Sequence, residues 1–208
     1  MTAHPNARLE TFCDGVFAIA LTLLIIDLRI PVTTAIATSA DLWLALRHLL
    51  PSVFAFVLSF GIIFIAWVNH HEALRLIEKS SHPFIYANGV LLLGVVFVPF
   101  PTALLGESLL TSHAGPAVAL YSAAGALMGV GWALFGWTAL EPRALTRNER
   151  AAVLVRKGLK SAYFAIAFYG TCAIVAVWFP LVIAVVITLM WAYWVIFGLR
   201  SAGDLHSE

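Results

Sequence analysis

A carboxylate inside the first apolar run of the chain is the first feature that could do chemistry. Asp14 lies about one turn inside the N-terminal end of a stretch that runs from Arg8 to Pro31. An aspartate at membrane depth costs about 2.5 to 3.5 kcal/mol on insertion scales, so such residues face a bundle interior or a water-filled path. We therefore expect Asp14 to point into neighbouring helices, where a titrating relay is one role open to it.

Further polar groups occur in the motif AWVNHHEALR, which contains His70, His71 and Glu72. Adjacent histidines on a helix point about 100° apart, so both cannot easily bind one metal ion. The motif therefore favours hydrogen bonding or capping over a metal site. Asn88 is an amide within an apolar run, and an amide in hydrocarbon needs a partner. Asp14, His70 and Asn88 all fall in the same predicted half of the membrane, so they can meet.

Composition predicts the elements that position these groups. The 208 residues are 62% hydrophobic and 11% charged, with a mean hydropathy of +0.94, which is typical of an integral membrane protein. The apolar runs are continuous and lack the alternation of barrel strands, so we expect an all-α fold in one membrane domain, residues 1–208. Six windows have the length of a membrane-spanning helix, about 20 residues: 8–29, 48–69, 84–105, 116–139, 159–178 and 180–199.

The distribution of basic residues predicts the orientation. With the N-terminus inside, only Arg29 and Arg47 fall outside, which supports six spans and two cytoplasmic termini. A cleaved signal peptide is the alternative for the first span, but Asp14 within its apolar run argues against it. Nucleic-acid binding is not expected, because no aromatic residues are interspersed among the basic residues. The ten basic residues predicted inside are Arg8, Arg75, Lys79, Arg143, Arg147, Arg150, Arg156, Lys157, Lys160 and Arg200.

Several local patterns predict packing. Residues 32–41 have the composition of an exposed connection. Pro99 and Pro101 should bend or break the end of the third span, and the Gly125 and Gly129 pair allows a close helix approach. The two cysteines, Cys13 and Cys172, lie within spans and are expected to pack rather than pair. We expect spans five and six to form a tight pair at the lipid-facing periphery.

One face of the first span carries a regular apolar stripe. Phe12, Ile19 and Ile26 recur every seven residues, and Gly15, Thr22 and Leu23 fill the same stripe. Core packing would explain such a stripe by itself. Asp14 lies roughly 140° from Ile19, however, so two different faces avoid lipid. This arrangement suggests a helix that stands between its own bundle and a symmetry axis.

Catalytic motifs are missing from the sequence. It contains no paired carboxylates, serine elbow, H-E-x-x-H motif or phosphate-binding glycine loop, so neither an enzyme nor a cofactor is expected. The TVGYG filter of ordinary potassium channels is also missing. The stripe could line a narrow pore only if several copies of the chain surrounded one axis.

The segment R-x-x-x-F-C-D-G-V-F-A-I-A-x-T-L-L, from Arg8 to Leu24, resembles the RxxxFSD signature of the lysosomal and endosomal potassium-channel family (transmembrane protein 175). The W-x-x-H-H at Trp67 to His71, then Asn88, then P-F-P-T-A-L-L-G-E at Pro99 to Glu107 are similar to the family pattern in the same order. The resemblance covers the first half specifically. Its departure is Cys13 in place of serine, and a thiol is the poorer hydrogen-bond partner.

The resemblance implies an assembly and a set of roles. A chain with one six-span repeat is expected to form a homotetramer in a bacterial inner membrane, with the first helices lining the pore. Ile19 then matches the constriction, followed outward by Thr22, Leu23 and Ile26. The bracing network behind the pore helix matches Arg8, Phe12, Asp14, Trp67, His70 and Asn88.

The expected function is potassium permeation, with modest preference over sodium, through a hydrophobic constriction. Potassium ions, the bilayer and copies of the chain are the expected partners, and no cofactor is expected beyond the permeant ion. Two alternatives stay open at this point. One is a proton-coupled cation transporter that uses Asp14 and His70. The other is a non-conducting scaffold in which the stripe is only an oligomer contact.

Overall fold

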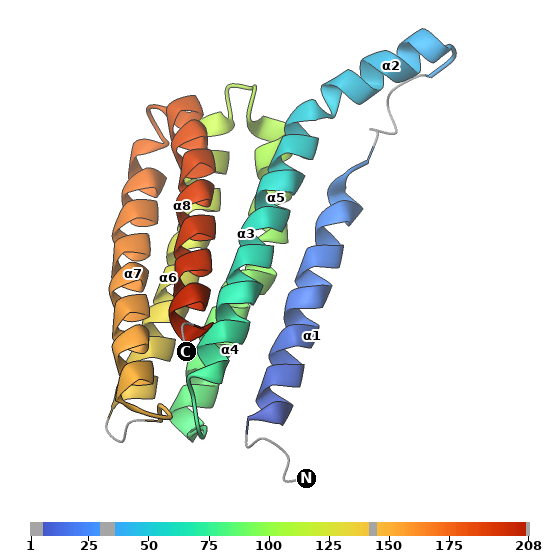
Figure 1. Ribbon diagram of the computed structural model, residues 1–208. Helices are drawn as coiled ribbons and strands as arrows, with labels where there is room; N and C mark the ends of the chain where they lie inside the picture. Colours follow the sequence, from blue (N-terminus) through green and yellow to red (C-terminus); the bar gives the residue numbers. More distant parts are fainter. Residues whose placement is uncertain (1–5, 30–35, 142–144, 207–208) are drawn as a thin grey trace.

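The computed structural model describes residues 6–29, 36–141 and 145–206, with the backbone alone for residue 197 and residues 199–206. Pro31, Arg143 and the side chain of Arg200 lie outside this description. The described chain is almost entirely helical (Figure 1). In order, the elements are α1 (Ala7–Leu23), the 3-10 helix η1 (Leu24–Asp27), α2 (Ser39–His48), α3 (Leu50–Arg75), α4 (His82–Phe97), α5 (Pro99–Ser108), α6 (Ala114–Leu140), α7 (Glu149–Val175) and α8 (Pro180–His206).

The prediction of an all-α membrane protein is confirmed, with apolar helices at the six predicted places. Five helical stretches are long and apolar enough to cross a bilayer, and the segment Pro180–Ile196 of α8 is a shorter apolar helix. The bounds differ most from the prediction at three helices, because helices continue through polar residues beyond the hydrocarbon. The second span ends at Arg75 rather than at residue 69, and the fifth begins at Glu149 rather than at residue 159. The sixth span runs to His206 rather than ending at residue 199.

Helix α2 was not predicted. Of the predicted exposed connection, residues 32–35 lie outside the described residues, and residues 36–40 are exposed as expected, but the chain is helical from Ser39 onward. A capping box starts the helix: the Thr38 hydroxyl accepts from the Asp41 amide, and the Asp41 carboxylate accepts from the Thr38 amide. The Thr38 hydroxyl also donates to the Asp41 carboxylate at 2.8 Å, and this bond, together with those from the Thr38 and Ala37 amides, holds the pKa of Asp41 below its usual value. Only ten residues long, α2 is too short to span a membrane, and it projects away from the bundle in Figure 1.

The two prolines break the third span as predicted. Helix α4 ends at Phe97, and α5 begins at Pro99, which occupies the first helical position. A proline there lacks only an amide hydrogen that would have no intrahelical partner. The Thr102 hydroxyl donates to the carbonyl oxygen of Val98 at 2.7 Å and meets the Ser59 hydroxyl at the same distance. Side chains thus satisfy backbone groups at the break.

Helix α6 is the centre of the bundle, because its glycines let helices approach on two sides. A methyl group on Gly125 would press on the Tyr169 ring, and one on Gly129 on Ile166, so this pair faces α7. The predicted packing role of the glycine pair is therefore confirmed. On another side, a methyl group on Gly131 would overlap the backbone of Leu91 in α4. The two contacts make α4, α6 and α7 a continuous layer.

The predicted tight pair of α7 and α8 is not observed. Helix α7 packs most closely along α6, whereas α8 lies mainly across α3 and α6 and touches α7 less. The Trp194 indole of α8 donates to the Tyr169 hydroxyl of α7 at 3.1 Å. A short turn joins α7 to α8 in the chain. The glycine-lined face of α6 nevertheless lets α7 approach more closely than α8 does.

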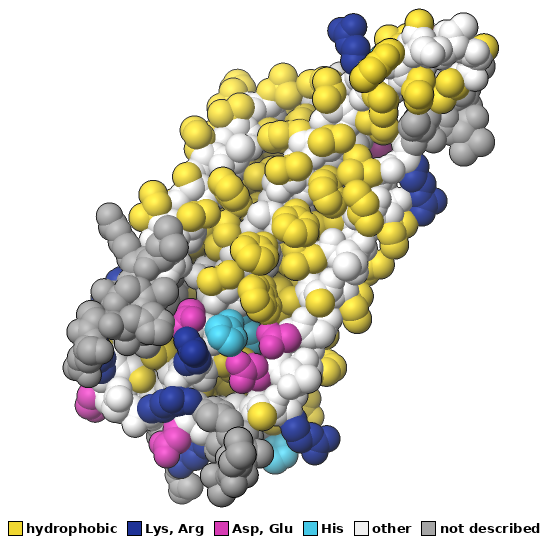
Figure 2. All heavy atoms as spheres, turned by 45° about the vertical axis from the view of Figure 1, so that its right-hand side comes forward, with side chains coloured by type: hydrophobic (Ala, Val, Ile, Leu, Met, Phe, Trp, Pro, Cys, Tyr) yellow, Lys and Arg dark blue, Asp and Glu magenta, His cyan; other side chains and the backbone are white. Residues whose placement is uncertain are grey.

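Helix α1 stands at the edge of the bundle (Figure 1) and packs on α3 and α4. The surface on this side is a broad apolar band, with acidic and histidine side chains gathered mainly at one end and basic side chains at both ends (Figure 2). A helix at the edge, joined along one side only, leaves its remaining surface free. This placement suits a helix whose other face meets another molecule.

We predict that Gly131→Ala destabilises the protein by about 1 to 3 kcal/mol, because the added methyl group forces α4 and α6 apart. Gly89→Ala is the matched control, since a methyl group there meets open space and alanine favours helix. The measurement is thermal unfolding of both variants in one detergent. Equal melting temperatures would contradict the close packing of α4 on α6.

Candidate functional site

Helix α1 presents two unlike faces. The buried face packs against α3 and α4 and consists of Cys13, Phe17 and Ala20, and it continues into η1 at Leu24. The other face is exposed in the single chain, with Phe12 at 63% and Ile19 at 59% of their full accessible surface. Thr22, Leu23 and Ile26, the other residues predicted to follow the constriction, are exposed on this face as well. The predicted constriction residues therefore share a free surface.

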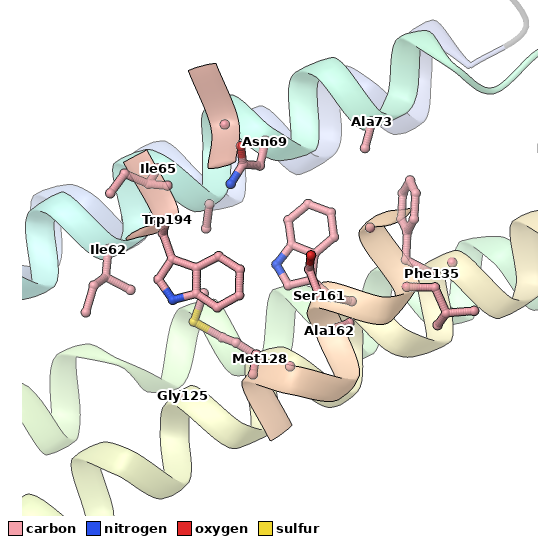
Figure 3. Close-up of a pocket in the computed structure, with 18 of the residues that line it drawn as sticks. Ile62, Ile65, Asn69, Ala73, Gly125, Met128, Phe135, Ser161, Ala162 and Trp194 are labelled. Atoms are coloured by element: carbon pink, nitrogen blue, oxygen red, sulfur yellow. The ribbon is translucent and has the colours of Figure 1, made fainter. Parts of the chain in front are cut away.

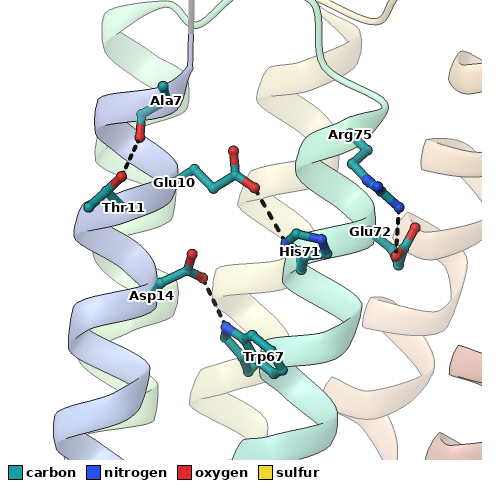
Figure 4. Close-up of polar contacts among 8 residues, drawn as sticks. All are labelled: Ala7, Glu10, Thr11, Asp14, Trp67, His71, Glu72 and Arg75. Atoms are coloured by element: carbon teal, nitrogen blue, oxygen red, sulfur yellow. Dashed lines mark hydrogen bonds and ion pairs between the residues drawn. The ribbon is translucent and has the colours of Figure 1, made fainter. Parts of the chain in front are cut away.

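Asp14 is tied to α3. The Trp67 Nε1–H donates to the Asp14 carboxylate at 2.9 Å, and both side chains are partly buried (Figure 4). A hydrogen bond to an ionised acceptor is about twice as strong as one between neutral groups. Trp67 also stacks near Phe64 and His71, with ring centroids 5.7 and 6.2 Å apart. These contacts fix the indole in the orientation that reaches Asp14.

One turn toward the N-terminus, a second contact joins the same helices. The Glu10 carboxylate lies 3.4 Å from His71 Nδ1, and both side chains are about one-third exposed (Figure 4). Its strength depends on protonation of His71, because only the imidazolium is charged. Glu10 and Asp14 are four residues apart on one helix face, and they meet His71 and Trp67, which are four residues apart on α3.

His70 and Asn88 form a separate pair inside the bundle. His70 is 0% exposed, and its Nε2 lies 2.9 Å from the Asn88 amide oxygen. Since the Asn88 amide nitrogen donates to the Phe84 carbonyl oxygen at 2.8 Å, its oxygen is left to accept, which places a proton on His70 Nε2. His70 Nδ1 is buried without a hydrogen-bond partner. The Phe17 ring of α1 lies 5.5 Å from the imidazole.

The structure brings four of the six predicted bracing residues together as two pairs, Asp14 with Trp67 and His70 with Asn88. It does not bring in the other two. Arg8 is exposed, and its side chain makes no hydrogen bond or ion pair with the described residues. Phe12 is exposed on the stripe rather than packed behind the helix.

Two contact residues were missed by the sequence analysis, Glu10 and Phe17. Helical spacing could have found both: Glu10 lies four residues before Asp14, and Phe17 lies four residues after Cys13 on the buried face. Cys13 itself is fully buried among apolar side chains. It therefore packs as a small apolar group and takes no part in the two polar pairs.

The arrangement holds α1 in place rather than carrying out a reaction. The adjacent histidines diverge as expected, His70 toward Asn88 and His71 toward Glu10. No group of three His, Cys, Asp or Glu side chains in the described ranges could hold a metal ion. Asp14 and His70 each have their own partner, and among the described residues no hydrogen-bonded path joins them.

Comparisons with known proteins agree on one family. The family model described as endosomal/lysosomal potassium channel TMEM175 matches residues 8–99. A potassium channel of Chamaesiphon minutus is 37% identical over 193 residues, covering 85% of this chain and 94% of that protein. A potassium channel of Streptomyces collinus is 38% identical over 135 residues, 64% of each chain. The crystal structure of a lysosomal potassium-selective channel TMEM175 homolog from Chamaesiphon minutus is similar with a TM-score of 0.77 and 32% identity, covering 93% of this chain and 97% of that one.

We predict that Trp67→Phe costs about 1 to 3 kcal/mol of stability, because it leaves a partly buried carboxylate without its donor. Trp137→Phe, at an exposed position on α6, is the control. In an Asp14→Leu background the Trp67→Phe change should cost much less, which a double-mutant cycle of unfolding measurements tests. Additive costs would contradict the pairing.

Proposed function

This chain belongs to the endosomal/lysosomal potassium channel TMEM175 family, and from that membership we propose that it conducts potassium passively through a pore lined by α1. We further propose that four copies surround the pore, so that each contributes one α1. One exposed helix face can form only one side of a pore, so a single chain cannot enclose it. The assembly is therefore part of the proposed function.

The observation that carries this proposal is the stripe on α1. Large aliphatic side chains stand exposed along it, although α1 is tied to its own bundle on another side by Asp14 and Trp67. A lipid-facing helix would need no polar bond to fix its rotation. Holding one particular face outward is useful where that face meets an axis.

We propose that Ile19 forms the narrowest ring, with Thr22, Leu23 and Ile26 beyond it. A hydrophobic ring offers no oxygen ligands, so ions must pass with partly removed hydration or not at all. Potassium sheds water more easily than sodium, which gives a modest preference. The same ring can close the pore by dewetting.

We also propose that the protein lies in a cell membrane with both termini in the cytoplasm. Lys79, Arg147 and Arg150 lie in or beside connections at one end of the bundle, whereas Arg29 and Arg47 lie at the other. A transporter that cycles protons through Asp14 and His70 is less well supported, because His70 is wholly buried and held by Asn88.

We predict that Ile19→Asn in reconstituted protein brings the potassium-over-sodium permeability ratio close to one, because the amide supplies ligands to both ions. Ile19→Ala should raise conductance by widening the ring. Single-channel recording under bi-ionic conditions measures both quantities.

Ile174→Asn is the control, since Ile174 is similarly exposed, at 65%, but lies on α7. Its currents should match those of the parent protein. Unchanged selectivity and conductance in both Ile19 variants would remove Ile19 from the proposed constriction, and uptake that saturates and moves protons would favour a transporter.

A further inference from the structure

A cavity of about 170 Å³, partly open to the outside of the single chain, lies between α3, α6, α7 and α8 and away from α1 (Figure 3). Gly125, Gly129 and Gly136 of α6 lie in its wall, where they pack closely against α7. A methyl group on Gly158 of α7, which also lines the cavity, would meet open space. An apolar cavity of roughly 150 Å³ is large enough to take a benzene ring.

The wall is mostly apolar, with a few polar groups at one level of α3. Ile62, Ile65 and Met128 line one part (Figure 3). Asn69 lies further along α3 and Ser161 faces it from α7. An apolar pocket with a small number of convergent polar groups is the common form of a small-molecule site.

Glu72 is the one charged residue among the described residues of this wall. Its Oε1 lies 3.3 Å from an Arg75 guanidinium nitrogen at the exposed rim. Its Oε2 is buried and has no hydrogen-bond partner. A buried carboxylate oxygen is costly to leave unpaired, so this atom marks a place for a donor.

Two aromatic side chains of α6, Trp132 and Phe135, also line the cavity, and their ring centroids lie 5.7 Å apart. Phe135 lies near the level of Ala73 (Figure 3). Aromatic rings in the same wall as a carboxylate suit an organic ammonium group, because both attract a positive charge. Arg156 and Lys160 of α7 are exposed and lie outside the wall.

We propose that this cavity binds a small amphipathic amine, with its ammonium group on Glu72 and its apolar body between α3, α6 and α7. A fatty acid fits less well, because its carboxylate would meet the charge of Glu72. A neutral chain would fill the apolar part but leave Oε2 unpaired. The site lies behind the proposed pore helix and does not depend on the proposed conduction.

The test is isothermal titration of the purified, detergent-solubilised full chain with 4-phenylbutylamine, beside its neutral counterpart 4-phenylbutanol in the same detergent. The amine should bind about tenfold more tightly than the alcohol. Glu72→Gln should remove this difference while alcohol binding stays the same. Glu78→Gln, at an exposed position outside the cavity, is the charge control and should change neither ligand.

A second pair of variants places the ligand. Gly158→Leu should fill the cavity and abolish binding of both compounds. Gly170 is on the same helix but outside the wall, and a side chain added there also meets open space. The Gly170→Leu variant should therefore bind both compounds like the parent protein. Amine binding that survives Gly158→Leu, or that is unaffected by Glu72→Gln, would overturn the proposal, as would equal affinity for amine and alcohol.

Discussion

The hydrogen bond from Trp67 to Asp14 joins α1 to α3 at a depth where a free carboxylate is costly. Because no water is available in hydrocarbon to replace the indole donor, the bond fixes both the height and the rotation of α1. Glu10 and His71 repeat the connection one turn away. Two polar contacts on one face leave the helix little freedom to turn, and this decides which of its residues face outward.

The bond can position α1 only if α3 is itself held firmly. Helix α3 packs on α5 and α8, and the bundle behind it depends on the glycine contacts of α6 with α4 and α7. The His70 and Asn88 pair links α3 to α4 within the same interior. Close glycine packing therefore supports the rigid wall from which Asp14 is held. Gly125 and Gly129 also lie in the wall of the cavity that Glu72 lines, so the close contact with α7 and the cavity share one face of α6.

The sequence was most informative where hydropathy acts over a whole helix. The six apolar helices, the break at Pro99 and the approach at Gly125 follow from length, proline geometry and small side chains. Helix α2 was missed because its signal is a short capping box at Thr38 and Asp41, within a stretch that looks like a connection. The helix against which α7 packs most closely could not be predicted, because a short turn to α8 does not determine which neighbouring helix has the more complementary surface.

Pairing among polar residues was only partly predictable, and the reason is geometric. Sequence places Asp14, His70 and Asn88 at one depth, but depth alone does not distinguish a shared network from separate pairs. The positions of Trp67 and His70 on α3 decide it: three residues apart, about 60° around the helix, they face α1 and α4 respectively. The exposed stripe has a similar origin. Ile19 lies about a third of a turn from the face of Phe17 and Ala20, so burying that face against α3 and α4 necessarily leaves Ile19 outside.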